Sequence, residues 1–123
     1  MICHAELAAP SECCGLLIGR GGIVQAAIPM PNIARTPRTR FEVDPASHIA
    51  LRRVLRAVTP GNSIVGVYHS HPVGPAVLSP RDLADAHYDD WVHIVVGRVA
   101  TRWRVRAYRI QNRRARAVKI RAT

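Results

Sequence analysis

The stretch HSHPVGPAVLSPRD, residues 69–82, brings residues that can bind a metal ion close together in the sequence. His69 and His71 stand two apart at the end of a predicted strand, so their side chains project from the same face. Asp82 falls in the first turn of the helix predicted next and can add a carboxylate oxygen. Two imidazole nitrogens and one oxygen leave a tetrahedral zinc ion one open position, as in catalytic zinc sites.

A hydrolytic site of this kind also needs a general base and a hydrogen-bond donor for the developing oxyanion. Ser79 is placed to be that donor. Glu12, just before the apolar run Cys13–Ile18, is the candidate base. Glu6 is a competing carboxylate, but it lies within a predicted helix.

Each of these residues also has a simpler interpretation. Two histidines in an HxH pair are common on exposed strands that bind no metal. Ser79 can act as a helix N-cap, and Asp82 as a favourable negative charge in the first turn. These capping roles are compatible with a metal site, and the joint spacing (HSH, seven residues, then SxxD) favours one. The remaining histidines are interpreted as surface or core residues: His4, His48, His87 and His93.

The elements that must position these residues can be predicted from hydrophobic periodicity and turn signals. Helices are predicted over 2–9, over 46–58 and from Ser79 onward. The stripe Ile49, Leu51, Val54, Leu55 and Val58 is expected to face the core. Strands are predicted at 14–20, 23–30, 41–44 (FEVD), 63–71, 91–97 and 102–110, and in the closing segment 116–122. Together these helices and strands predict an α+β domain with a mostly antiparallel sheet and two or three helices packed against it.

Composition indicates the number of domains and the kind of partner. The chain has 123 residues, 48% of them hydrophobic, which predicts a single domain spanning 1–123. Lys and Arg number 18 against 8 Asp and Glu, giving a net charge of +10. From Arg98 onward the basic residues have no acidic counterpart. The excess indicates either an acidic partner, protein or nucleic acid, or a solvated basic face.

The sequence favours a cytoplasmic protein. Its N-terminus lacks the features of a signal peptide, and its longest apolar run is too short for a membrane span. Cys3, Cys13 and Cys14 form no CxxC pair and are interpreted as small buried side chains rather than disulfides.

The pattern H-S-H-P-x(6)-S-x-x-D resembles the JAMM motif of the MPN-domain metalloproteases, with each signature position filled: His69, Ser70, His71, Pro72, Ser79 and Asp82. Residues 4–19 (HAELAAPSECCGLLIG) are similar to the family's first helix and strand, and 64–72 (IVGVYHSHP) to its central strand. The single-domain bacterial branch fits best. Members usually begin with a further strand and more of a helix, so an element is expected to be missing or shortened here.

The resemblance implies a cytidine-deaminase-like fold and assigns roles to residues. His69, His71 and Asp82 would bind one Zn²⁺ per chain, Glu12 would be the general base and Ser79 would stabilise the oxyanion. Ser70 would support the backbone of the site and is a further candidate for contact with the substrate.

The resemblance also implies a substrate class. The reaction would be hydrolysis of the peptide or isopeptide bond after the C-terminal Gly-Gly of a ubiquitin-like protein, here a β-grasp sulfur carrier. A homodimer and an acidic partner surface are further expectations, and no membrane partner is expected. The alternatives are a basic, nucleic-acid-associated protein, which the absence of a recognised binding motif disfavours, and a scaffold that binds ubiquitin-like folds without cutting them.

Overall fold

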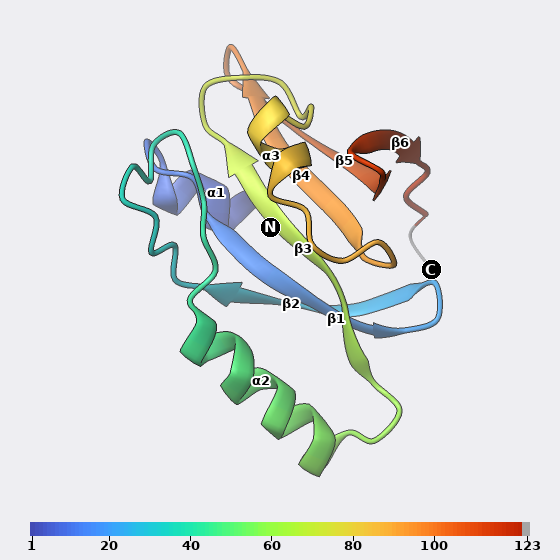
Figure 1. Cartoon of the computed structure of the whole chain (residues 1–123). Coiled ribbons are helices and arrows are strands. Elements are labelled where there is room, and N and C mark those ends of the chain that lie inside the picture. Colours follow the sequence, from blue (N-terminus) through green and yellow to red (C-terminus); the bar gives the residue numbers. More distant parts are fainter. Residues whose placement is uncertain (122–123) are drawn as a thin grey trace.

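A six-stranded sheet organises the computed structural model, which describes residues 1–121 (Figure 1). The strands lie in the order β2-β1-β3-β4-β5-β6, and every neighbouring pair is antiparallel except β3 and β4. The predicted α+β class with a mostly antiparallel sheet is confirmed. The elements are α1 (Ile2–Ala8), β1 (Cys14–Arg20), β2 (Ile23–Met30), α2 (Pro45–Val58), β3 (Ser63–His71), α3 (Pro80–Ala84), β4 (Val92–Val99), β5 (Arg102–Gln111) and β6 (Arg114–Val118).

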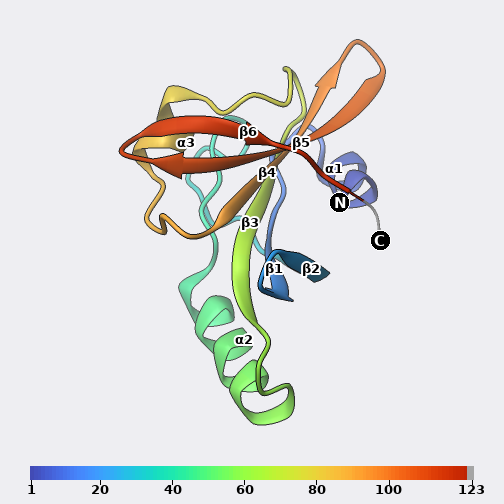
Figure 2. The same cartoon turned by 90° about the vertical axis from the view of Figure 1, so that its right-hand side faces the viewer.

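The two faces of the sheet bury different sets of side chains, because successive residues of a strand point to opposite sides. On one face, Cys14, Leu16 and Val67 pack with Leu55 of α2. On the other face, a second cluster packs beneath α1 and comprises Ala5, Cys13, Leu17, Tyr68, Ile94, Val96 and Ala107. Figure 2 shows α1 and α3 on opposite sides of the sheet. We call the side bearing α3 the site face, since the predicted functional residues lie there.

The parallel pairing of β3 and β4 requires a connection that returns along the sheet. Residues 72–91 make this connection and include α3. The first part of it lies flat on β4: a side chain at Gly97 would collide with the backbone of Pro75 and Ala76. The Tyr108 hydroxyl donates a hydrogen bond of 2.6 Å to the Ala76 carbonyl. The chain is thereby held against the sheet just before it reaches Ser79 and Asp82.

Several local predictions are wrong. The FEVD segment forms no strand; Val43 makes only an isolated bridge with Asn32. The last strand covers 114–118, residues 119–121 lie outside it, and residue 122 falls beyond the described part of the chain. Cys3 is exposed, whereas Cys13 and Cys14 are buried as expected.

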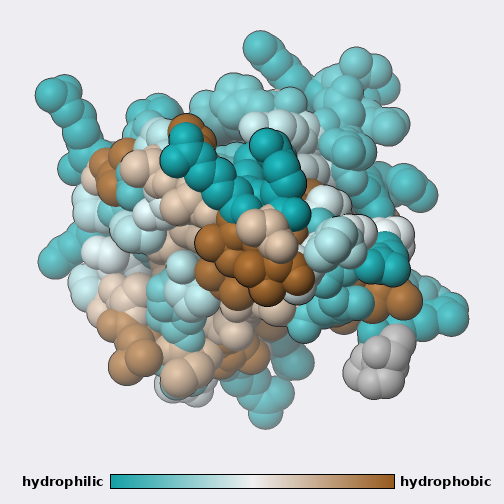
Figure 3. Space-filling model, turned by 90° about the horizontal axis from the view of Figure 1, so that it is seen from below, coloured by the Kyte–Doolittle hydropathy of each residue, from teal (hydrophilic) through white to brown (hydrophobic). Residues whose placement is uncertain are grey.

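The apolar stripe of α2 is only partly covered. Leu51 and Leu55 pack against the sheet, but Ile49, Val54 and Val58 are exposed. The helix lies at the lower end of the sheet, so one side of it meets the core while the rest faces solvent. Viewed from below, where α2 lies, the surface shows apolar patches between hydrophilic side chains (Figure 3).

The helices within residues 1–121 are too short or too polar for any of them to cross a bilayer.

Candidate metal centre and catalytic site

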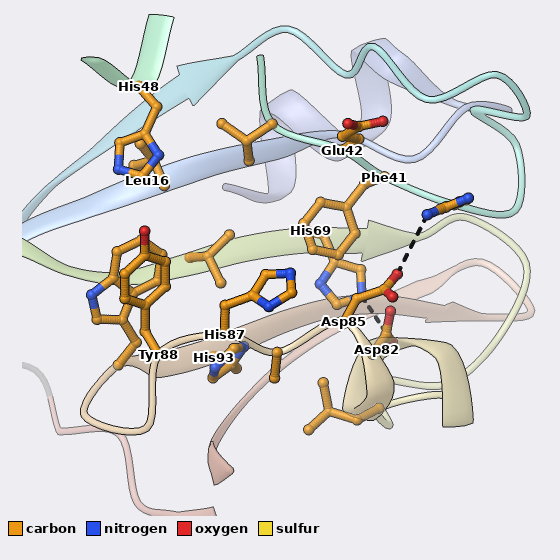
Figure 4. Close-up of a pocket in the computed structure, with 16 residues that line it drawn as sticks. Leu16, Phe41, Glu42, His48, His69, Asp82, Asp85, His87, Tyr88 and His93 are labelled. Atoms are coloured by element: carbon orange, nitrogen blue, oxygen red, sulfur yellow. Dashed lines mark hydrogen bonds and ion pairs between the residues drawn. The ribbon is translucent and has the colours of Figure 1, made fainter. Parts of the chain in front are cut away.

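The side chains of His69, His71 and Asp82 converge at the end of β3 (Figure 4 shows His69 and Asp82). The two Nε2 atoms lie 3.0 Å apart. Asp82 Oδ2 lies 3.1 Å from His69 Nε2 and 3.2 Å from His71 Nε2. Three potential ligand atoms therefore meet at one point, in the combination that the spacing predicted.

Local structure fixes the direction of each ligand. His69 and His71 alternate with Ser70 along β3, so both point to the site face. His71 Nδ1 donates to the Pro75 carbonyl at 3.1 Å, which turns Nε2 toward His69 and Asp82 and makes it the ring nitrogen that would coordinate a metal ion. Asp82 is held by a capping box at the start of α3: its Oδ2 accepts from the Ser79 N–H at 2.8 Å, and its own N–H donates to Ser79 Oγ at 3.1 Å.

The electrostatics of the three groups follow from burial and from their mutual contacts. Burial alone would raise the pKa of Asp82, but hydrogen bonds from both histidines and from Ser79 outweigh it and hold that pKa well below its usual range. Burial lowers the pKa of His69 despite Asp82. Burial also lowers the pKa of His71, but the contacts with Asp82 and the Pro75 carbonyl outweigh burial and raise that pKa above its ordinary value. The carboxylate of Asp82 is thus kept ionised.

Glu12 lies beside these groups. One of its carboxylate oxygens and the ring nitrogens of His69 and His71 lie within 4.8 Å of one another. The side chain is buried, and Oε1 has no hydrogen-bond partner. Burial raises the pKa of Glu12 to about 7, with His71 opposing the shift and Asp82 adding to it. A carboxyl group with such a pKa can take up and release a proton near neutral pH.

The two serines have different surroundings. Ser79 is partly exposed, and its Oγ accepts the Asp82 N–H, so its own hydroxyl hydrogen is free to donate. Ser70 is fully buried on the opposite face and accepts a hydrogen bond of 2.8 Å from the Cys13 N–H. This burial leaves Ser70 no surface to offer a substrate. The contact instead ties β3 to the segment that carries Glu12.

The donor set fits a zinc ion. At 3.0–3.2 Å from one another, the three atoms are spaced like ligands that share one zinc ion at about 2.0–2.2 Å each. Two imidazoles and one carboxylate are a set that catalytic zinc sites use. The unpartnered Oε1 of Glu12 supplies a buried acceptor next to the three ligands.

Comparison with known proteins identifies the family. A family model described as prokaryotic homologs of the JAB domain matches residues 1–111. The chain belongs to this prokaryotic JAB family. The expectation of an MPN-type relative is confirmed.

Among curated proteins, a probable TtuB-protein conjugate cleaving protease of Thermus thermophilus is 42% identical over 86 residues, covering 69% of this chain and 55% of that protein. The desampylase of Haloferax volcanii is 34% identical over 88 residues, covering 70% and 62%. The CysO-cysteine peptidase of Mycobacterium bovis is 33% identical over 114 residues, covering 89% and 75%. The chain therefore spans less than two thirds of the length of the first two relatives.

Solved structures share the fold. A solution structure of a Desulfitobacterium hafniense protein superposes with a TM-score of 0.83 at 27% identity, covering 97% of this chain and 83% of the other. A JAB1/MPN domain protein from Archaeoglobus fulgidus gives a TM-score of 0.57 at 21% identity, covering 94% and 82%.

A groove of about 340 Å³ opens beside the candidate metal centre of this JAB domain (Figure 4). Phe41 forms part of its wall and stacks on the His69 ring, with ring centroids 4.3 Å apart. Tyr88 and Trp91 stack on each other at 4.0 Å. Three histidines interpreted from sequence as surface or core residues also line the groove: His48, His87 and His93. No signal in the sequence linked them to the site, because His48 lies on α2, His93 on β4 and His87 in the loop between α3 and β4.

Asn32 is a positioning residue that the sequence analysis missed. Its Nδ2 donates to the carbonyls of Glu12 and Arg40, both at 3.0 Å. Its Oδ1 accepts from the N–H groups of Ala34 and Glu42 at 3.1 and 3.0 Å. One side chain thus joins the backbone of Glu12 to the loop that carries Phe41.

Replacing Asn32 by alanine should destabilise the JAB domain by roughly 1–3 kcal/mol, because four backbone groups lose a partner. Aspartate keeps the two acceptor contacts of Asn32 but loses both donors, including the one to Glu12. Urea unfolding of the wild type and of the two variants measures their free energies of unfolding. Comparable stability of the alanine variant and the wild type would contradict the role assigned to Asn32.

Proposed function

We propose that this protein is a zinc-dependent peptidase or isopeptidase that hydrolyses the bond after the C-terminal Gly-Gly of a ubiquitin-like or sulfur-carrier protein. The observation that carries the proposal is the convergence of His69 Nε2, His71 Nε2 and Asp82 Oδ2 within 3.0–3.2 Å, beside the unpartnered carboxylate of Glu12. Hydrolase activity agrees with the names of the relatives, all of which are peptidases or conjugate-cleaving enzymes.

His69, His71 and Asp82 would hold the metal ion, one per chain. When bound, zinc polarises a carbonyl group and lowers the pKa of a bound water toward ~7. The capping box and the hydrogen bond to the Pro75 carbonyl fix the directions of the Asp82 and His71 side chains.

Glu12 would act as the general base. Its carboxylate would accept a proton from the attacking water and deliver it to the nitrogen of the leaving amine as the C–N bond breaks. The raised pKa of about 7 suits both transfers. Ser79 would donate its free hydroxyl hydrogen to the oxyanion that develops on the scissile carbonyl.

The substrate class rests on the relatives and on the shape of the site. Their names specify TtuB-protein conjugates, a desampylase reaction and CysO-cysteine. A Gly-Gly tail has no side chains that could collide with the walls of the groove. The groove beside His69 is walled by Phe41, Tyr88 and Trp91, so it would accept such a tail in an extended form.

The proposal can be tested with a β-grasp sulfur carrier that carries a short peptide after its Gly-Gly. We expect mass spectrometry to locate a single cut directly after the second glycine. A chelator should abolish cleavage and zinc should restore it. A control substrate in which the last glycine is replaced by leucine should be cut at least about tenfold more slowly, because the side chain would collide with the groove. Cleavage that persists in chelator would contradict the proposal.

A further inference from the structure

Three arginines form a row on β5. Arg102, Arg104 and Arg106 occupy alternate positions, so they share one face of the sheet, and all three are exposed. We call them the arginine row. They belong to the final part of the chain, where no acidic residue follows Asp90.

The register of the sheet places this row on the site face. Arg106 pairs with Val95 and Arg104 with Gly97. Those two residues of β4 pair in turn with His69 and His71 of β3. Directly paired residues project to the same side. Because neighbouring strands lie about 4.8 Å apart, the backbones of Arg104 and His71 are separated by roughly 10 Å.

Other arginines of β4 and β5 have partners within the molecule. Arg98 lies over the Trp103 ring, 5.3 Å from its centroid, and Arg109 donates to the Asp90 carbonyl at 2.6 Å. Within residues 1–121, the one ion pair between an arginine and a carboxylate joins Arg40 and Asp85. The arginine row therefore has no internal counter-charge in the described part of the chain.

Within residues 1–121, no strand pairs with the edge of β5 beside the row. Strand β6 pairs with residues 107–111 only, and Figure 2 shows the β4–β5 hairpin projecting away from β6. Charged side chains on a bare edge discourage an added strand. The row is better suited to contact with the charged surface of a folded partner than to strand addition.

Two exposed apolar residues border the segment 74–76, which lies over β4 between the strand of the row and the strand of His71. Val73 and Val77 are 89% and 55% exposed. They flank the segment that packs on β4, where Ala76 lies over Gly97 and Gly74 forms a bridge with Arg98. An apolar contact area bordered by positive charge is a common composition for a protein interface.

We propose that the arginine row, with Val73 and Val77, is the docking surface for an acidic face of the carrier protein whose tail is cut. This inference rests on the proposed function. The carrier is the component that every substrate shares, whereas the leaving group can vary from a single amino acid to a protein. A fixed surface next to the centre would therefore recognise the carrier, and opposite charges would speed association.

The test compares two double variants with the same change in charge. Arg104→Glu/Arg106→Glu reverses the charge of two of the three residues of the row. Arg114→Glu/Arg116→Glu alters β6 residues that pair with Gln111 and Arg109 on the opposite face. Each is assayed on an acidic β-grasp carrier extended after its Gly-Gly, and on a peptide of that carrier's last residues with the same extension. Circular dichroism and zinc content check the fold, and Arg104→Gln/Arg106→Gln replaces the first variant if it fails to fold.

We expect the Arg104/Arg106 variant to lower kcat/KM on the carrier by at least about tenfold, mainly through KM, and to weaken its dependence on salt. Its activity on the peptide should stay within about twofold of the wild type. The Arg114/Arg116 control should change both activities by less than about threefold. Equal losses in the two double variants, or an equal loss on carrier and peptide, would overturn the proposal.

Two further measurements separate this inference from the proposed function. If the wild type cuts neither substrate, the proposed function fails. Fluorescence anisotropy with the labelled carrier then tests docking alone, and binding weakened only in the Arg104/Arg106 variant would support it. Duplex DNA that binds more tightly than the carrier at physiological salt, through Arg104 and Arg106, would identify a nucleic-acid surface and overturn it.

Discussion

Replacing Glu12 by glutamine should abolish cleavage while leaving the metal in place. Glutamine has almost the same shape but cannot accept the proton from the attacking water. The loss of a general base costs about 10²–10⁴ in rate, and we expect kcat to fall by roughly 10³-fold. Initial rates on the extended carrier, together with zinc content, measure both parts of the prediction.

Glu6 supplies the matched control. It is the competing carboxylate near the N-terminus, and it is exposed on α1. Glu6→Gln removes the same charge and should leave kcat within about twofold of the wild type. A Glu12→Gln protein that retains zinc and cuts at the wild-type rate would show that the proton acceptor lies elsewhere.

Replacing Asp82 by asparagine should remove zinc without unfolding the start of α3. The amide oxygen can still accept the Ser79 N–H and preserve the cap, but it is a poorer metal ligand than a carboxylate. Changes to residues around the ligands typically cost 10–100-fold in metal affinity, so loss of a ligand should cost more than about 100-fold. Competition with a zinc chelator measures the affinity.

Asp82→Ala separates the two roles of this residue. Alanine keeps the backbone N–H that donates to Ser79 Oγ, but it loses both the ligand and the acceptor for the Ser79 N–H. In the presence of excess chelator it should therefore be less stable than Asp82→Asn by about 1 kcal/mol. The two variants should be equally poor at binding zinc. Wild-type zinc affinity in Asp82→Asn would mean that Asp82 stabilises the start of α3 and does not bind the metal.

The positions of His69, His71 and Asp82 could be predicted because each depends on local rules. Strand parity puts His69 and His71 on one face, and the Ser79-x-x-Asp82 spacing of a capping box fixes the position of the carboxylate. The resemblance to the JAMM pattern then selected Glu12. The structure places its carboxylate beside both histidines, as this assignment requires.

The contacts that complete the site could not be predicted, because they join segments far apart in the sequence. Asn32 reaches the Glu12 carbonyl twenty residues away through a loop with no periodicity. The sequence predicts only that His93 belongs to a buried strand. The groove that His93 lines also needs residues 40–43, which fold over the sheet from a distant part of the chain. The FEVD segment (41–44) alternates like a strand, but most of it belongs to the 40–43 loop and it pairs only through Val43.

The docking surface illustrates the same limit. Alternation along residues 102–107 predicts that one side of β5 is basic. It does not say whether that side is the one bearing the metal centre. That answer depends on the pairing of β5 with β4 and of β4 with β3, which only the three-dimensional register supplies.

The most direct test of the central claim is to locate the metal by anomalous diffraction at the zinc edge in crystals of the wild-type protein. We predict one zinc ion per chain, about 2.0–2.2 Å from His69 Nε2, His71 Nε2 and an oxygen of Asp82. An ion bound elsewhere, or none in crystals grown with equimolar zinc, would contradict the assignment of these three residues as a catalytic metal centre.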